Sequence, residues 1–456
     1  MWQEETARDA RWWRDRVARH GSELTRLAGP AVMMRLGVVG LGMVDTAMVG
    51  HYATRDLAWL NLANQSLIMF ALVAALGLLM GTLVFTANAY GADDMAECGR
   101  VWRRSLPFAG GLAVLILIVL LPAELWLGLL GQPDDMAAES GRIARILALG
   151  MPAHLLFIHS TMFLEGVKRT EVGFYLMMAA NVINAGLNYL LIYGHGGLPE
   201  MGAAGSAWTS TVVRWFLAGS VICYVWWSPS LTQYGLRKPH GQKWSDWSAQ
   251  RQMGYASCVS LTAEVLAFGA LAIFAGWIGT VPLAAHGVVY QVLGVPLMIA
   301  VGIGVASSVR VGIAFARRDR LDTLLAGLMG LAVTLVIAGT FALAIAQFTA
   351  PALGIFTDDH RVVEILLPIT LVFTLGMLLD ALQMVMAGAL RGLKETWWPT
   401  ALQTTAFVGV MLPVCYILAF PMDRGLRGLM EGTLAGVTVS FFFQLARFRH
   451  LVSLRR

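Results

Sequence analysis

The chain has 456 residues, 57% of them hydrophobic and only 13% charged, and its mean hydropathy is +0.66. Soluble domains carry about 25% charged residues, so this composition excludes a soluble globular protein and indicates an integral membrane protein. The net charge is +5, but the basic residues lie in loops and tails, so nucleic-acid binding is not indicated. We interpret the four cysteines, which form no C-x-x-C pair, as packing residues and not as disulfides or metal ligands.

The first residues are charged. Residues 1–24 mix Arg with Trp and lack the apolar core of a signal peptide. Two interpretations stay open, a basic amphipathic helix on the inner membrane surface or a charged tail.

Twelve apolar segments follow, each long enough to span a bilayer, which takes about 20 residues. In chain order they are 26–50, 58–89, 105–130, 143–165, 173–194, 203–227, 253–279, 283–311, 322–349, 362–390, 398–420 and 427–446. An inside N-terminus places most of the 33 Lys and Arg residues on the inner side. We therefore expect an all-α membrane protein with both termini in the cytoplasm.

A repeat divides these spans six and six. LEGVKRT at 164–170 is echoed by LRGLKET at 390–396, and ANAYGADD at 87–94 meets GIAFARRD at 312–319 near the same shift. Six spans per half give both halves one orientation, so we predict two six-helix bundles related by a pseudo-two-fold axis, as in transporters, with substrate bound between them. A shared ancestral loop is the alternative.

The expected domains follow from this division. They are a cytoplasmic N-terminal segment (1–25), an N-lobe (26–227), a cytoplasmic linker (228–252), a C-lobe (253–446) and a cytoplasmic tail (447–456).

Three acidic residues, Asp45, Glu264 and Asp380, lie within apolar spans. A charge at the bilayer centre costs about 2.5–3.5 kcal/mol on insertion scales, and such residues usually mark ion or proton paths. Glu264 and Asp380 each lie roughly 15–17 Å from the inner ends of their spans, at about 1.5 Å per residue. We predict that they share one cation or proton site. Two separate protonated carboxyl groups are the alternative.

Asp45 lies near the outer end of the first span. Asn184 and Asn188, an i, i+4 pair on one helix face, and Ser210, which two threonines flank, lie at similar depth. Carboxylate, amide and hydroxyl oxygens suit a small hard cation such as Na⁺. The same groups can instead hold a protonated Asp45 or join helices.

Other polar residues within the spans are harder to assign. The repeat places His154 opposite Asp380, which allows a proton role, but we favour a core histidine, and His159 one turn away weakens a special role for either. Arg35 and Arg214 are the basic residues at depth. Arg214 either pairs with an acid or extends towards the interface.

Seven segments in both halves carry an ordered set of motifs: GMVDTAMVG (42–50), FLEGVKRTEVGF (163–174), INAGLNYLLIYG (183–194), LTAEVLAFGAL (261–271), AAH (284–286), SSVRVG (307–312) and LLDALQMVMAGALRGLKETWWP (378–399). They resemble the multidrug and toxin extrusion (MATE) family, specifically its NorM branch. The resemblance covers nearly the whole chain.

The resemblance implies export of cationic amphipathic compounds in exchange for Na⁺ or H⁺. It carries the cation role of the C-lobe onto Glu264 and Asp380, and that of the N-lobe onto Asp45, Asn184 and Asn188. The family's hydroxyl in the sixth span is usually Thr, and the best-aligned position here is Ser210. A bacterial inner membrane is also implied.

Motifs of enzymes are missing: the sequence has no G-x-x-x-x-G-K-[ST], G-x-S-x-G or H-E-x-x-H. We therefore expect no enzyme and no cofactor, and transport that an ion gradient drives. Cationic small molecules and the bilayer are the expected partners, and a monomer the expected state. The alternatives are a flippase for lipid-linked or anionic amphipathic substrates, which needs basic groups, and a membrane-embedded transferase with acid–base carboxylates.

Overall fold

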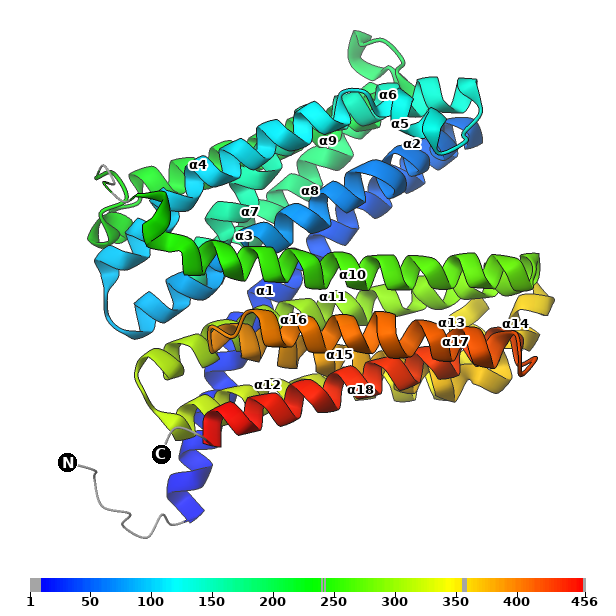
Figure 1. The fold of residues 1–456 in the computed structure, drawn as a ribbon. Coiled ribbons are helices and arrows are strands. Elements are labelled where there is room, and N and C mark those ends of the chain that lie inside the picture. Colours follow the sequence, from blue (N-terminus) through cyan, green and yellow to red (C-terminus); the bar gives the residue numbers. More distant parts are fainter. Residues whose placement is uncertain (1–9, 239–240, 242, 355–358, 454–456) are drawn as a thin grey trace. The chain divides into compact units, whose positions relative to one another are not determined.

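The computed structural model describes residues 10–238, 241, 243–354 and 359–453, and these residues form helices and connecting turns without a β-strand (Figure 1). Ten helical runs are long and apolar enough to cross a membrane, and one bent helix pair makes an eleventh. The prediction of an all-α integral membrane protein is confirmed.

The first half of the chain supplies six spans. Their helices are α1 (Ala10–Tyr52), α2 (Thr54–Ala63), which continues through a π-helical turn (Asn64–Ile68) into α3 (Met69–Gly91), α4 (Met95–Leu120), the short α5 (Ala123–Leu129), α6 (Asp134–Leu149), α7 (Met151–Gly166), α8 (Thr170–Tyr193) and α9 (Gly202–Trp227). Short 3₁₀ turns follow at His195–Gly197, Pro229–Tyr234 and Trp244–Trp247.

The second half supplies six more. They are α10 (Ser248–Ile278), α11 (Thr280–Ala316), α12 (Arg320–Gln347) with the short α13 (Thr349–Gly354), α14 (His360–Leu366) leading through Leu367–Ile369 into α15 (Thr370–Gly392), α16 (Trp397–Thr404) joined by a π-helical turn (Thr405–Met411) to α17 (Leu412–Ala419), and α18 (Gly425–Ser453).

Two spans depart from a simple apolar helix. α6 and α7 meet at a bend of 44°, where Gly150 and Pro152 interrupt the helix, because proline lacks the amide hydrogen that a continuous helix needs. α9 is 26 residues long but is not among the helices that are apolar enough to count as spans, and Arg214 together with several Ser and Thr residues interrupts its apolar sequence. At about 1.5 Å per residue α9 is still long enough to cross a bilayer.

The chain forms two compact units. The N-terminal unit comprises Met33–Thr262, and the C-terminal unit comprises the described residues on either side of it. Both boundaries fall inside helices, so α1 and α10 each contribute to both units. The lobes expected from the sequence, 26–227 and 253–446, remain our proposal for the two evolutionary halves.

Small residues explain why the start of α10 belongs with the N-terminal unit. Gly77 and Gly81 of α3 lie against the backbone of α10 at Cys258 and Gln250, and Gly254 of α10 lies against the backbone of Leu78. Glycine allows two helix backbones to approach closely, which is a common basis of helix association in membranes. A side chain at these positions would have to push the two helices apart.

Ion pairs hold the start of α1 in the C-terminal unit. Arg16 Nη2 lies 2.8 Å from Asp319 Oδ2 and 2.7 Å from Asp322 Oδ1, and the Asp319 carboxylate also accepts from the Asp322 amide as the N-cap of α12. Residues 10–24 are therefore helical, with His20 and Leu24 buried and most side chains of 11–19 exposed. A helix, one of the two interpretations left open, is what the structure has over this stretch. Residues 1–9 lie outside the described part of the chain.

His20 extends this network into the interior. Its Nε2 lies 2.9 Å from Asp322 Oδ1, and its Nδ1 lies 2.7 Å from Arg310 Nη2. Since a guanidinium only donates, Nδ1 accepts and Nε2–H donates to the carboxylate. Arg310 also pairs with Glu23 of α1. The neutral tautomer of His20 thus joins α1, α11 and α12.

Replacement of Asp322 by Asn tests how much this network contributes to the stability of the folded protein. The change leaves Arg16 and His20 without their shared anion in a partly buried place, and we expect a loss of about 2 kcal/mol of stability. The measurement is thermal unfolding of the purified protein in detergent. Asp135→Asn is the control, because its pair with Arg55 is exposed and such pairs contribute about 0–1 kcal/mol. Equal unfolding temperatures for the two variants would contradict the prediction.

Candidate functional site

Asp45 of α1 is the centre of a polar cluster in the N-terminal unit. Its Oδ1 accepts from Asn184 Nδ2 at 3.0 Å and from Asn188 Nδ2 at 2.6 Å, both on α8. Its Oδ2 accepts from Ser210 Oγ of α9 at 2.8 Å. The four residues that the sequence placed at one depth therefore meet in one cluster, held by three helices.

The cluster is buried and rich in oxygen atoms. Asp45 is 9% exposed, and both asparagines are almost fully enclosed. All three hydrogen bonds are donated to Asp45, whose carboxylate oxygens act as acceptors. In the described part of the chain, Asn188 Oδ1 and the neighbouring Thr209 Oγ1 are buried and accept or donate no hydrogen bond. Amide, hydroxyl and carboxylate oxygens are thus close enough to serve a hard cation.

Arg214 lies on the same helix as Ser210, one turn further on. Its Nη1 donates to the Leu147 carbonyl at 3.0 Å, at the end of α6, and its charge is within electrostatic range of Asp45. The Leu147 carbonyl also accepts from the Gly150 amide at 3.1 Å, so the guanidinium is a second donor to this carbonyl at the bend between α6 and α7.

A second cluster lies in the C-terminal unit. Gln403 Nε2 of α16 donates to Glu264 Oε2 of α10 at 2.7 Å, and Gln383 Nε2 donates to Asp380 Oδ1 within α15 at 3.2 Å. Glu264 and Asp380 lie within electrostatic range of each other, so the structure brings the two predicted acids together. Gln403 stands just before a π-helical turn, an irregularity that is frequent at functional sites.

Arg391 and Tyr290 complete this cluster, and the sequence alone did not reveal them. Arg391 is half-buried near the end of α15 and interacts electrostatically with Glu264. Tyr290 of α11 faces both acids. Arg391 follows Asp380 by eleven residues, which is three helical turns and hence the same face of α15. That spacing was the available signal, but the residue stood just past the predicted span.

Glu165 is a buried acid that was overlooked because it is the last residue of the predicted span 143–165. It closes α7 and is 2% exposed, and its Oε1 accepts from Arg35 Nη2 of α1 at 3.2 Å. Arg35 therefore has an ionic partner inside the N-terminal unit, which reduces its value as a site for an anionic headgroup.

The two histidines of α7, His154 and His159, have different neighbours. His159 is buried, its Nε2 lies 3.0 Å from Ser105 Oγ, and its ring packs near Trp102, as expected of a core histidine. His154 lies within electrostatic range of Arg214.

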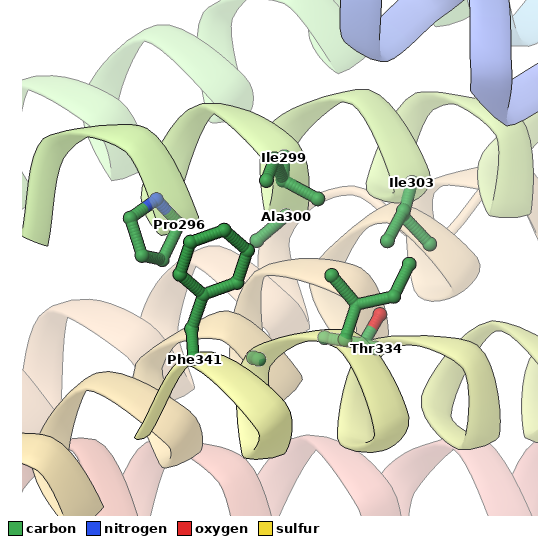
Figure 2. Close-up of a pocket in the computed structure, with 8 residues that line it drawn as sticks. Pro296, Ile299, Ala300, Ile303, Thr334 and Phe341 are labelled. Atoms are coloured by element: carbon green, nitrogen blue, oxygen red, sulfur yellow. The ribbon is translucent and has the colours of Figure 1, made fainter. Parts of the chain in front are cut away.

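The crevice in Figure 2 does not provide a site for cations. It lies between α11 and α12 and is lined by Pro296, Ile299, Ala300, Ile303, Thr334, Ile337, Ala338 and Phe341, almost all of them apolar. The one lining hydroxyl, that of Thr334, donates to the Gly330 carbonyl of its own helix.

Comparison with known proteins agrees with this arrangement. The family model MatE matches residues 30–190 and 256–417. The chain belongs to the MatE family. A "Probable multidrug resistance protein NorM" of Caulobacter vibrioides is 33% identical over 94% of this chain and 91% of its own. "Multidrug resistance protein PmpM" of Pseudomonas aeruginosa is 29% identical over 93% of this chain and 90% of its own.

Solved structures show the same fold. The outward-facing conformation of a multidrug resistance MATE family transporter matches with a TM-score of 0.87 at 19% identity, over 96% of both chains. The twelve-helix fold in two bundles is thus that of MATE transporters, as predicted. Since members of this family are transporters, the transferase alternative is excluded.

The Arg35–Glu165 pair gives a test of how the N-terminal unit is held together. Removing one partner of a buried pair leaves an uncompensated charge, so we expect Glu165→Gln to cost about 3–5 kcal/mol, whereas the double change Arg35→Met with Glu165→Leu recovers most of that loss. Thermal unfolding of the single and double variants in detergent measures the coupling. Additive losses would show that the two side chains do not interact.

Proposed function

We propose that this transporter exports cationic amphipathic compounds in exchange for Na⁺ or H⁺, and so acts in multidrug efflux. The observation that carries the proposal is that each unit holds its own buried carboxylate cluster, built of side chains that can bind a small cation or a proton. The printed names of its relatives, NorM and PmpM multidrug resistance proteins, support the choice of cargo.

The chemistry of the N-terminal cluster follows from its donors. Asn184, Asn188 and Ser210 stabilise Asp45 as an acceptor, which keeps it ready for a cation. A proton on Asp45 turns one carboxylate oxygen into a donor, so at least one of these hydrogen bonds must reorganise. A bound Na⁺ instead draws in the amide and hydroxyl oxygens. Either event changes how α1, α8 and α9 are held together, and this coupling allows the cation to favour one conformational state.

In the C-terminal cluster, Glu264 lies within electrostatic range of Asp380 and of the cation Arg391. Two nearby carboxylates repel each other when both are ionised, and an arriving Na⁺ or proton relieves this repulsion. Binding therefore favours a compact arrangement of α10, α15 and α16. A substrate that prefers the other conformational state is expelled because the two ligands have different affinities for the two states.

Energetics favour the use of more than one ion. A hundredfold outward gradient of a monovalent cationic drug costs about 2.8 kcal/mol for concentration and about 2.3 kcal/mol more at 100 mV. One entering cation with a tenfold gradient at that voltage supplies about 3.7 kcal/mol. One ion falls short and two suffice, which gives a physical reason for two acidic clusters.

The proposal also covers the membrane, the orientation and the oligomeric state of the protein. Its place is a bacterial inner membrane, with both termini in the cytoplasm and the polar linker 228–252 on the same side, because Lys and Arg gather there. It works as a monomer, with cationic small molecules as its only soluble partners.

A flippase for anionic amphipathic substrates is the second candidate. It needs basic side chains at depth, but Arg35 is paired with Glu165 and Arg214 donates to the Leu147 carbonyl. Acidic clusters at both sites favour cationic cargo.

The test is efflux of a fluorescent cationic dye from proteoliposomes under an imposed Na⁺ gradient and then under an imposed pH gradient. We expect one gradient to drive transport in the wild type, and Asp45→Asn, Glu264→Gln and Asp380→Asn each to lower the driven flux by about tenfold or more, as the loss of coupling between two ligands allows.

Two controls accompany this test. Ser210→Thr keeps the hydroxyl that donates to Asp45 and should retain transport, and Asp135→Asn removes an exposed acid outside both clusters. If neither gradient drives transport by folded wild-type protein, antiport is wrong and the flippase becomes the better hypothesis.

A further inference from the structure

Exposed arginines gather at one end of the C-terminal unit. The start of α1 is held at this end by the ion pairs of Arg16 with the first turn of α12. The last turns of α18 lie there too, because Phe448 packs against Gly327 of α12. We call the exposed arginines of these segments the basic rim, and they are Arg11, Arg14, Arg19 and Arg26 of α1, Arg318 and Arg320 around the start of α12, and Arg449 of α18.

The acids at this end leave most of that positive charge uncompensated. The ion pairs there are Arg16 with Asp319 and Asp322, Arg19 with Asp322, Arg310 with Glu23, Arg447 with Glu395 and, at 3.9 Å on the surface, Arg14 with Asp15. Within the described residues, no ion pair engages Arg11, Arg26, Arg318, Arg320 or Arg449. The basic rim is therefore a surface of strong positive charge.

α1 presents its arginines on the face opposite its packed side. His20 and Leu24 are buried, whereas Arg11, Arg14 and Arg26 are exposed. At 3.6 residues per turn, each of these arginines lies about 120–180° around the helix axis from His20. The contacts of His20 with α11 and α12 therefore hold the arginine face outward.

The start of α1 is inclined to the helices that it meets. His20 contacts Arg310 of α11 at 2.7 Å, and Val32 of α1 lies against Gly302 of α11. Between these two contacts α1 advances by about 18 Å while it moves about 12 Å along α11, and Figure 1 shows it crossing α12 at an angle. The exposed Trp13 stands at the beginning of this segment. An inclined helix with tryptophan and a basic face is typical of a segment in the membrane interface.

We propose that the basic rim binds the headgroups of anionic phospholipids in the inner leaflet. A guanidinium group presents its N–H donors in a planar fork that matches phosphate oxygens. Clusters of about four to eight basic residues next to a membrane helix attract an anionic membrane surface. The inference goes beyond the proposed function, since it needs no antiport, and shares with it only the placement of this end on the cytoplasmic side.

A lipid fits this surface better than a soluble anion does. The apolar side chains of Trp13 and Val17 are exposed on α1 beside the arginine face. A phospholipid offers acyl chains to these side chains as well as a phosphate to the arginines, whereas inorganic phosphate offers only charge. With headgroups on one face and α11 and α12 on the other, the start of α1 is held from both sides.

Lipid binding to the purified full chain measures this preference. Native mass spectrometry in detergent gives the apparent Kd for added phosphatidylglycerol and for added phosphatidylcholine. We expect the wild type to prefer phosphatidylglycerol, and the triple variant Arg11→Gln, Arg14→Gln and Arg26→Gln to lose at least about fivefold of that preference, the contribution of one arginine near an anionic surface. Added salt should weaken the preference of the wild type, because exposed charges are screened.

A matched control removes three arginines from the N-terminal unit. Arg55, Arg142 and Arg145 each pair already with an acid, so their joint replacement by Gln changes the net charge equally and leaves the basic rim intact. The preference for phosphatidylglycerol should then equal that of the wild type. Inorganic phosphate is the second probe, and we expect it not to displace phosphatidylglycerol at equal concentration.

Three results would overturn the inference. They are a folded triple variant that keeps the wild-type preference, a control variant that loses as much preference as the triple variant, and displacement of phosphatidylglycerol by an equal concentration of inorganic phosphate. If the triple variant does not fold, Arg14→Gln alone decides by the same ratio of Kd values. The measurement uses no ion gradient, so wild-type protein without gradient-driven efflux would refute the antiport proposal and leave this test intact.

Discussion

The cost of placing a carboxylate inside a membrane is the constraint on which this structure depends. An ionised side chain at the bilayer centre is unfavourable by several kcal/mol unless neighbouring groups replace its water. Here each deep acid has donors from a neighbouring helix or from its own: two asparagines and a serine for Asp45, and one glutamine each for Glu264 and Asp380. The donors make ionisation tolerable and leave oxygen atoms that a cation can use.

This arrangement links the sites to the architecture. α1 and α10 are the two helices that contribute to both compact units, and each carries an acid, Asp45 on α1 and Glu264 two residues beyond the boundary on α10. A cation that binds either acid acts on a helix whose two ends belong to different units. The ion pairs of Arg16 and the hydrogen bonds of His20 fix the beginning of α1 to α11 and α12.

Sequence reasoning predicted the spans and the Asp45 cluster because polar residues stand out against apolar helices and helical spacing gives their depth. It missed Glu165 and Arg391 because both stand at the ends of predicted spans, where charge is ordinary. Gln383 and Gln403 were missed because a neutral amide is a weak signal until its partner on another helix is known. The sequence left open whether residues 10–24 form a helix or a charged tail. The structure pairs Arg16 of this stretch with acids about 300 positions away, and local sequence patterns do not reveal such contacts. The break between α6 and α7 falls at Gly150 and Pro152, inside the span 143–165 that the sequence predicted as one helix.

The central claim is that the two clusters are separate cation sites, and a count of bound cations tests it most directly. The measurement is equilibrium binding of ²²Na⁺ to the purified protein, together with proton release in the same sample, for the wild type, Asp45→Asn and the double variant Glu264→Gln with Asp380→Asn. The account predicts two cations, Na⁺ or H⁺, per wild-type molecule, with one lost in Asp45→Asn and the other lost in the double variant. Loss of both cations in Asp45→Asn, or a count that neither substitution changes, would contradict it.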